Sequence, residues 1–396
     1  MATPTAHVKR IESIDILRGL VMIIMALDHL RDYLHIDANL HDPLDLLATT
    51  PILFFTRWIT HFCAPVFVFL SGASIYLQSL RKTKKELSIF LLKRGLWLVF
   101  AEIFIVSFGV TFIPFYNFLF LQVIWAIGIS MIVLGLVVHL RFEVILGIGL
   151  AIVLGHNLLD FPEAAVGFKP NLLWEFLHKG GIEKIFGITV FMFYPFVPWL
   201  GLMMLGYCTG IFFTSKFSVE QRKKILLQLG FGLIATFVIV RFINVYGDPL
   251  PWAKQQQPFY TFLSFIKVQK YPPSLLYMCI TIGPALLFLA SIEKVQNGVT
   301  DVLRTYGRTA FFYYLLHFYL AHIICGVAFF LRGHTWHQAF EAAKAFPFLF
   351  QIGGEGYSLT VVYIVWICLV ASLYPLCKWY DGYKTSHKEK RWLSYL

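Results

Sequence analysis

The chain has 396 residues, of which 58% are hydrophobic and only 14% charged, and its mean hydropathy is +0.70. Soluble domains carry about 25% charged residues, so a soluble globule, a disordered chain and a coiled coil are excluded. The net charge is +11, from 33 Lys and Arg against 22 Asp and Glu. In a chain this apolar, a basic excess is typical of cytoplasmic loops and not of a nucleic-acid partner.

Ten apolar runs are long enough to cross a bilayer, which takes roughly 20 helical residues. The runs are continuously apolar and lack the alternation of a membrane β-barrel. The sequence therefore predicts an all-α, polytopic bundle of about ten transmembrane helices. In chain order the spans lie near 14–35, 52–79, 89–113, 118–139, 143–160, 187–213, 225–246, 273–292, 309–331 and 358–379.

The distribution of Lys and Arg predicts the orientation of the bundle. Basic residues fall in every second connection, and cytoplasmic loops carry such an excess, so both termini are expected in the cytoplasm. We expect a cytoplasmic tail over 1–13, a transmembrane domain over 14–380 and a basic cytoplasmic tail over 381–396. The basic segments are Lys9–Arg10, 81–85, Arg141, 216–224, 294–308 and 384–391.

Three connections on the expected outer side, 161–186, 247–272 and 332–357, are too long for simple turns. In the first, apolar residues between Leu172 and Ile185 follow the pattern of an amphipathic helix in the membrane interface. Such loops either cap a site or connect spans passively. The six cysteines form no CxxC pair, so neither a disulfide framework nor a zinc site is predicted, and no metal is expected.

The first span carries the most informative ionisable residues. A charge at the bilayer centre costs about 2.5–3.5 kcal/mol on insertion scales, so such residues are functional candidates. Asp15 and Arg18 are spaced to pair at the cytoplasmic edge, which is also what a simple membrane anchor needs. Asp28 and His29 follow; at 1.5 Å per residue His29 lies about 16 Å beyond Arg18. The load of charges also argues against a cleavable signal peptide.

Later spans add cations and histidines. Arg57 and His61 share a helix face near the outer end of the second span, and Arg94 and Glu102 form either a buried pair or part of a polar cavity in the third. Sorted by expected depth, Arg18, Arg94 and Arg308 lie on the cytoplasmic side, whereas His29, Arg57, His61, Arg241 and His317 lie from the middle outward.

This sorting limits the chemistry. Cations at the inner mouth suit a phosphorylated cytosolic donor, and histidines near the middle suit proton transfer at neutral pH. Arginines at the outer mouth suit an anionic or sugar-like acceptor. The residues alone fit either group transfer across the membrane or a proton-coupled secondary transporter that uses Asp28, His29 and His317 as a relay. A non-catalytic scaffold has no use for a buried Asp–His pair.

Five ordered sequence stretches resemble one known family. The set is similar to the catalytic domain family of heparan-α-glucosaminide N-acetyltransferase and its bacterial membrane acyltransferase relatives. The stretches are RIESIDILRG with MALDH (10–19 and 25–29), APVFVFLSGAS (64–74), YPFVPWLG (194–201), KYPPSLL (270–276) and GRTAFFYYLLH (307–317).

The resemblance implies a transferase that takes acetyl from cytosolic acetyl-CoA and passes it to an amine or hydroxyl of a glucosamine-type sugar or glycan at the outer face. An arginine followed by a histidine in the first helix recurs among membrane acyltransferases, and Arg18 and His29 match it. In the lysosomal member the active histidine lies in the following loop, where this chain has His35 and His41. These two are the alternatives to His29.

The expected roles follow from combining depth and resemblance. Asp28 and His29 are the predicted catalytic pair, with His29 acting either as a general base or as a covalent acetyl carrier. Arg18, Arg94 and Arg308 are predicted to bind acetyl-CoA. The predicted acceptor-binding residues are Arg57, His61, Arg241 and His317. We expect the protein in a bacterial inner membrane, with the lipid bilayer as partner and the choice between monomer and homodimer open.

Overall fold

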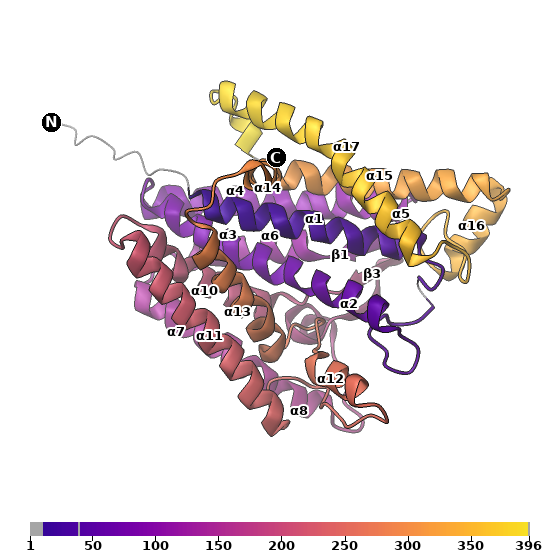
Figure 1. Cartoon of the computed structure of the whole chain (residues 1–396), viewed down its shortest axis with the longest axis horizontal. Helices are drawn as coiled ribbons and strands as arrows, with labels where there is room; N and C mark the ends of the chain where they lie inside the picture. Colours follow the sequence, from indigo (N-terminus) through magenta and orange to yellow (C-terminus); the bar gives the residue numbers. More distant parts are fainter. Residues whose placement is uncertain (1–10, 39, 395–396) are drawn as a thin grey trace.

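The computed structural model describes residues 11–38 and 40–394 and is mostly helical, with 70% helix and 4% strand. The prediction of a helical bundle is confirmed at this level. Lys9, Arg10 and most of the predicted N-terminal tail lie outside the described residues. Figure 1 shows long helices side by side, with shorter elements gathered at the end of the bundle where α1 finishes.

Seven helical segments in the described part of the chain are long and apolar enough to cross a membrane, so the protein is an integral membrane protein. They are α2–α3 (Pro51–Ser79), α7–α8 (Phe142–Glu163), α10 with its last turn (Phe196–Phe213), α11 (Val219–Ile243), α13 (Leu275–Ile292), α15 (Ala310–Leu331) and α17 (Leu359–Ser386). Each overlaps a predicted span.

The other three predicted spans are also helical, but they are not among the seven segments that are long and apolar enough to cross a membrane. They are α1 (Glu12–Leu34), α4 (Lys84–Ala101) with its continuation to Thr111 in α5 (Ser107–Thr111), and α6 (Val123–Val137). α1 and α4 carry many charged residues, and α6 is short. α1 tolerates its charges because it packs against α3, α14, α15 and α17 and is mostly buried in protein. The count of about ten spans and the orientation stay predictions.

Local signals fix where helices begin in three of the basic connections. Thr83 and Glu86 form a capping box at the start of α4, and Ser218 and Gln221 form one at the start of α11. Such a box satisfies amide donors that a helix N-terminus leaves unpaired. A third box, at Asn297, begins α14 (Gly298–Arg308), so the expected loop 294–308 is mainly a helix.

Helices α1 and α14 touch through one glycine on each. A Cβ at Gly19 would lie 1.8 Å from the carbonyl oxygen of Leu303, and a Cβ at Gly307 would lie 1.8 Å from that of Asp15. Small residues allow such close backbone approach between membrane helices. This contact places the N-terminal turns of α1 beside Arg308.

We expect Gly19→Ala to destabilise the protein by about 3 kcal/mol, because the added methyl meets backbone, which cannot rotate away. The measurement is the apparent melting temperature of the purified chain in detergent. Gly147→Ala in α7 is the matched control, since a Cβ there meets nothing within 4 Å and should raise stability slightly. Equal melting temperatures for the two variants would contradict the close contact.

A three-stranded sheet lies at the end of the bundle where α1 finishes (Figure 1). The central strand β3 (Ile188–Met192) pairs in parallel with β1 (Phe118–Leu121) and antiparallel with β2 (Gly181–Ile185). Phe186 and Gly187 both have positive φ, as a two-residue hairpin turn requires. Residues 118–121 and 188–192, expected as ends of spans, are therefore strands.

The long connections contain structure of their own. The predicted interfacial helix is wrong beyond Lys179, because helical turns over α9 (Leu172–Trp174) and Glu175–Lys179 end at Gly180 and β2 follows. Gly180 has φ +73°, which stops a helix. The other short elements are α8 (Asp160–Glu163), α12 (Pro258–Ile266) and α16 (Trp336–Ala345).

Candidate functional site

A large and strongly basic cavity lies beside the first half of α1. We call this space, of about 790 Å³, the cationic cavity; it is bounded by α1, α3, α4, α6, α14, α15 and the C-terminal residues. No Asp or Glu is among its lining residues within the described ranges. Its seven Lys and Arg residues are Arg18, Lys82, Arg94, Arg308, Lys384, Lys388 and Lys390. All three residues predicted to bind the donor thus line one cavity.

The arginines of the cationic cavity are held by neighbouring polar groups. Arg18 pairs with Asp15 at 3.1 Å and donates to Ser74 Oγ at 2.9 Å. Arg308 pairs through Nε with Asp381 at 3.0 Å. The Asp15–Arg18 pair expected for a simple anchor therefore forms, and Arg18 still faces the cavity. Fixed guanidinium groups are suited to binding phosphate, because less side-chain freedom is lost on binding.

Three lysines near the C-terminus complete this lining and were not predicted as site residues. Lys384, Lys388 and Lys390 lie at the end of α17 and in the turn after it, and Lys390 Nζ donates to the hydroxyl of Tyr383 at 2.7 Å. The sequence showed a basic tail. It did not show that the tail folds back beside Arg94 and Arg308.

Glu102 has a structural role at the other end of α4. Its carboxylate accepts from the backbone N–H groups of Gln122 at 3.0 Å and Trp125 at 3.2 Å. These donors belong to the N-terminus of α6, where an anion is favourable. Glu102 does not line the cationic cavity.

The second space, of about 370 Å³, lies at the far end of α1, and we call it the histidine cavity. The ring of His29 faces it and packs 4.1 Å from the ring of Phe318 and 5.2 Å from that of His317, between centroids. Among the described residues, none hydrogen-bonds to either ring nitrogen of His29. An imidazole with a free lone pair in a cavity is able to accept a proton or attack a carbonyl.

Asp28 lies beside this cavity among three cations. Its carboxylate pairs with Arg31 at 3.0 Å and with Arg57, and Lys270 Nζ lies 4.0 Å away. The structure therefore pairs Asp28, one of the two predicted catalytic residues, with these cations. Since Arg57 and Lys270 also line the cavity, the cluster presents positive charge to a bound molecule.

His61 and His317, predicted to contact the acceptor, do not line the histidine cavity. The backbone carbonyl of His61 accepts from the hydroxyl of Tyr277 at 2.8 Å. His317 is fully buried behind His29; its Nδ1 lies 3.2 Å from the carbonyl oxygen of Tyr313, and its Nε2 has no partner among the described residues.

Arg241 lies at the end of α11, also outside the cavity. Its guanidinium lies 3.7 Å from Asp248. Burial raises the pKa of the Asp248 carboxyl, which lies outside the spans. Arg241 thus ties α11 to the connection that leads to Lys270. Its other partners are the carbonyl oxygens of Leu250, Ser264, Phe265 and Lys267, at 2.6–3.1 Å.

His35 and His41, the alternatives to His29, line a third and smaller cavity of about 150 Å³. This cavity shares Asp32 and Arg57 with the histidine cavity. His35 and His41 do not reach the space that His29 faces.

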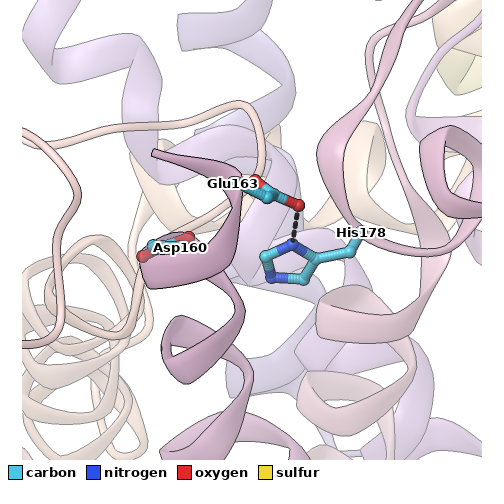
Figure 2. Close-up of side chains that lie close together, drawn as sticks. All are labelled: Asp160, Glu163 and His178. Carbon is cyan, nitrogen blue, oxygen red and sulfur yellow. Dashed lines mark hydrogen bonds and ion pairs between the residues drawn. The ribbon is translucent and has the colours of Figure 1, made fainter. Parts of the chain in front are cut away.

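Asp160, Glu163 and His178 form a separate cluster whose ligand-type atoms lie within 4.8 Å of one another. Figure 2 shows the Glu163 carboxylate directed at the ring of His178, with Nδ1 at 2.8 Å. His178 Nε2 lies 3.2 Å from His156 Nδ1, so both ring nitrogens have partners. The cluster holds α8 to the turn after α9, and its atoms could also bind a cation.

A family model described as heparan-alpha-glucosaminide N-acetyltransferase, catalytic, matches residues 10–238, more than half of the chain. The match includes Arg18, His29, Arg57 and Arg94 from the two cavities. No curated protein matches the chain in sequence. The chain therefore belongs to the heparan-alpha-glucosaminide N-acetyltransferase catalytic family, a family of transferase-type enzymes.

Proposed function

We propose that the protein transfers an acetyl group from acetyl-CoA to an amine or hydroxyl of a glucosamine-type sugar or glycan across the membrane. The observation that carries this proposal is that the two cavities adjoin. Three residues, Phe67, Val123 and Tyr314, belong to the linings of both. A donor with its phosphates in the cationic cavity could thus bring its thioester to the histidine cavity.

The cationic cavity has the charge that the donor requires. Coenzyme A carries several phosphate charges, and Arg and Lys bind phosphate through charge-assisted hydrogen bonds. Arg18, Arg94 and Arg308 are the residues proposed to bind these phosphates. We place this cavity on the cytoplasmic side of a bacterial inner membrane. Three of the basic segments that predict the orientation, 81–85, 294–308 and 384–391, contribute residues to its lining.

In the proposed reaction His29 acts as general base. The acceptor amine or hydroxyl attacks the thioester carbon, and His29 takes the proton that the nucleophile loses. The carbon–sulfur bond then breaks, and the imidazolium returns the proton to the leaving thiolate, which gives free coenzyme A. In the covalent route His29 itself attacks the thioester and passes acetyl on. The proposal includes both routes.

Arg57 and Lys270 are proposed to position the acceptor, because they present their charge to the histidine cavity. Arg241 is proposed to contribute indirectly, because it holds the connection that leads to Lys270. His317 supports the ring of His29 from behind, at 5.2 Å between centroids. His61 is proposed to support the acceptor side of the site indirectly. Its ring packs against that of Tyr277, with 5.3 Å between the two centroids.

The test of this function uses the purified full-length chain with acetyl-CoA labelled in the acetyl group and glucosamine as acceptor. We expect labelled acetylglucosamine. A chain that neither binds coenzyme A nor cleaves its thioester would contradict the proposal. Uptake of an amino sugar into proteoliposomes without acetyl-CoA would instead support a proton-coupled transporter.

Replacing Lys384, Lys388 and Lys390 together by alanine is expected to raise the KM for acetyl-CoA about tenfold with little change in kcat, since partly exposed charges each contribute modestly to binding. The effect should shrink at high salt. The matched control replaces Lys216, Lys223 and Lys224, a basic segment outside the cavity. An equal rise in KM for both triple variants would show a nonspecific charge effect and contradict a site near the C-terminus.

A further inference from the structure

Tyr314 occupies the boundary between the two cavities. It lines both of them, and it lies on α15 with His317 and Phe318, three and four residues later on the same helix face. Its ring packs 5.6 Å from that of His317 and 5.1 Å from that of Phe318. Phe318 in turn contacts the ring of His29.

The hydroxyl of Tyr314 is buried and has no hydrogen-bond partner among the described residues. Tyr314 is 3% exposed. Leaving a buried hydroxyl unpaired costs about 1–3 kcal/mol, and a hydrogen bond to a bound molecule would offset that cost. Since the side chain lines both cavities, a molecule that spans the boundary would lie against it.

We propose that the Tyr314 hydroxyl donates a hydrogen bond to the carbonyl oxygen of the acetyl thioester and stabilises the oxyanion that forms there. This inference rests on the proposed function. If the phosphates lie in one cavity and the acceptor in the other, the reacting carbon lies at the boundary that Tyr314 shares with Phe67 and Val123. Of these three side chains, only Tyr314 offers a donor.

The step balances without a further reactant. When the nucleophile attacks, the electron pair of the C=O bond moves to oxygen, and the Tyr314 O–H donates to that oxygen without transferring its proton. His29 takes the proton from the nucleophile. When the C=O bond re-forms, the thiolate leaves and receives that proton from His29. A fixed donor of this type stabilises the transition state more than the ground state.

The experiment compares Tyr314→Phe with Tyr313→Phe in the full-length chain. The adjacent Tyr313 is a matched control, because its hydroxyl is also buried and unpartnered, yet it lines neither cavity. We expect Tyr314→Phe to lower kcat about 10²-fold, in line with loss of one oxyanion donor, and to leave the KM for acetyl-CoA within about threefold. Tyr313→Phe should keep wild-type kcat.

Melting temperature and coenzyme A binding separate catalysis from structure, since Tyr314→Phe should lower neither of them. A loss of kcat that comes with a lower melting temperature or weaker coenzyme A binding would assign Tyr314 a structural role and overturn the inference. Wild-type kcat in Tyr314→Phe would overturn this inference alone. A wild-type chain that transfers no acetyl would overturn the proposed function and this inference with it.

Discussion

Replacing His29 by alanine is expected to lower kcat for acetyl transfer by about 10²–10⁴-fold, the usual contribution of a general base. The reason is the position of its ring, which faces the histidine cavity with both nitrogens free of hydrogen bonds to any described residue. If His29 carries acetyl covalently, the loss will be at least as large. The measurement is the rate of labelled acetyl transfer by purified protein at saturating acetyl-CoA.

His35→Ala and His41→Ala are the controls for this result. Both residues lie in the loop after α1, and they line the smaller neighbouring cavity, not the one that His29 faces. We expect each variant to keep at least about a third of wild-type kcat. Loss of transfer in either, together with an active His29→Ala variant, would move the catalytic histidine into the loop.

Replacing Asp28 by asparagine is expected to destabilise the protein by about 3–5 kcal/mol, because removal of one partner leaves the others as uncompensated buried charges. The Asp28 carboxylate is 9% exposed and lies among Arg31, Arg57 and Lys270. The effect should appear as a lower melting temperature in detergent and as less folded protein in size-exclusion chromatography.

Asp32→Asn provides the comparison, since Asp32 also pairs with Arg31 but its side chain is 49% exposed. Exposed ion pairs contribute only about 0–1 kcal/mol. A melting temperature of Asp28→Asn equal to that of Asp32→Asn would show that the cations do not depend on Asp28.

Hydropathy was enough to locate the apolar helices, because lipid contact selects long apolar runs locally. It failed at Phe118–Leu121 and Ile188–Met192, two short apolar runs that pair with each other as strands. Periodicity within one segment cannot reveal a partner about 70 residues away. Hydropathy also misses why α1 tolerates its charges. The helix is surrounded by protein, and hydropathy does not distinguish contact with protein from contact with lipid.

Sorting charges by depth brought Arg18, Arg94 and Arg308 to one predicted location, and the structure places all three in one cavity. Depth along a single helix follows from rise per residue. Depth does not determine the direction of a side chain. The sequence therefore could not predict that Arg241 faces a loop or that Lys270 lines the histidine cavity. Lys388 lines the cationic cavity only because the C-terminal residues fold back, which the sequence does not reveal.

Proteoliposomes test whether the protein transfers acetyl across the membrane. Glucosamine is trapped inside, labelled acetyl-CoA is added outside, and labelled acetylglucosamine inside the vesicles is measured. For chains with the cationic cavity facing outward, we expect labelled acetylglucosamine inside wild-type vesicles and none inside His29→Ala vesicles. Transfer that occurs only when both substrates are on the same side of the membrane would contradict transfer across it.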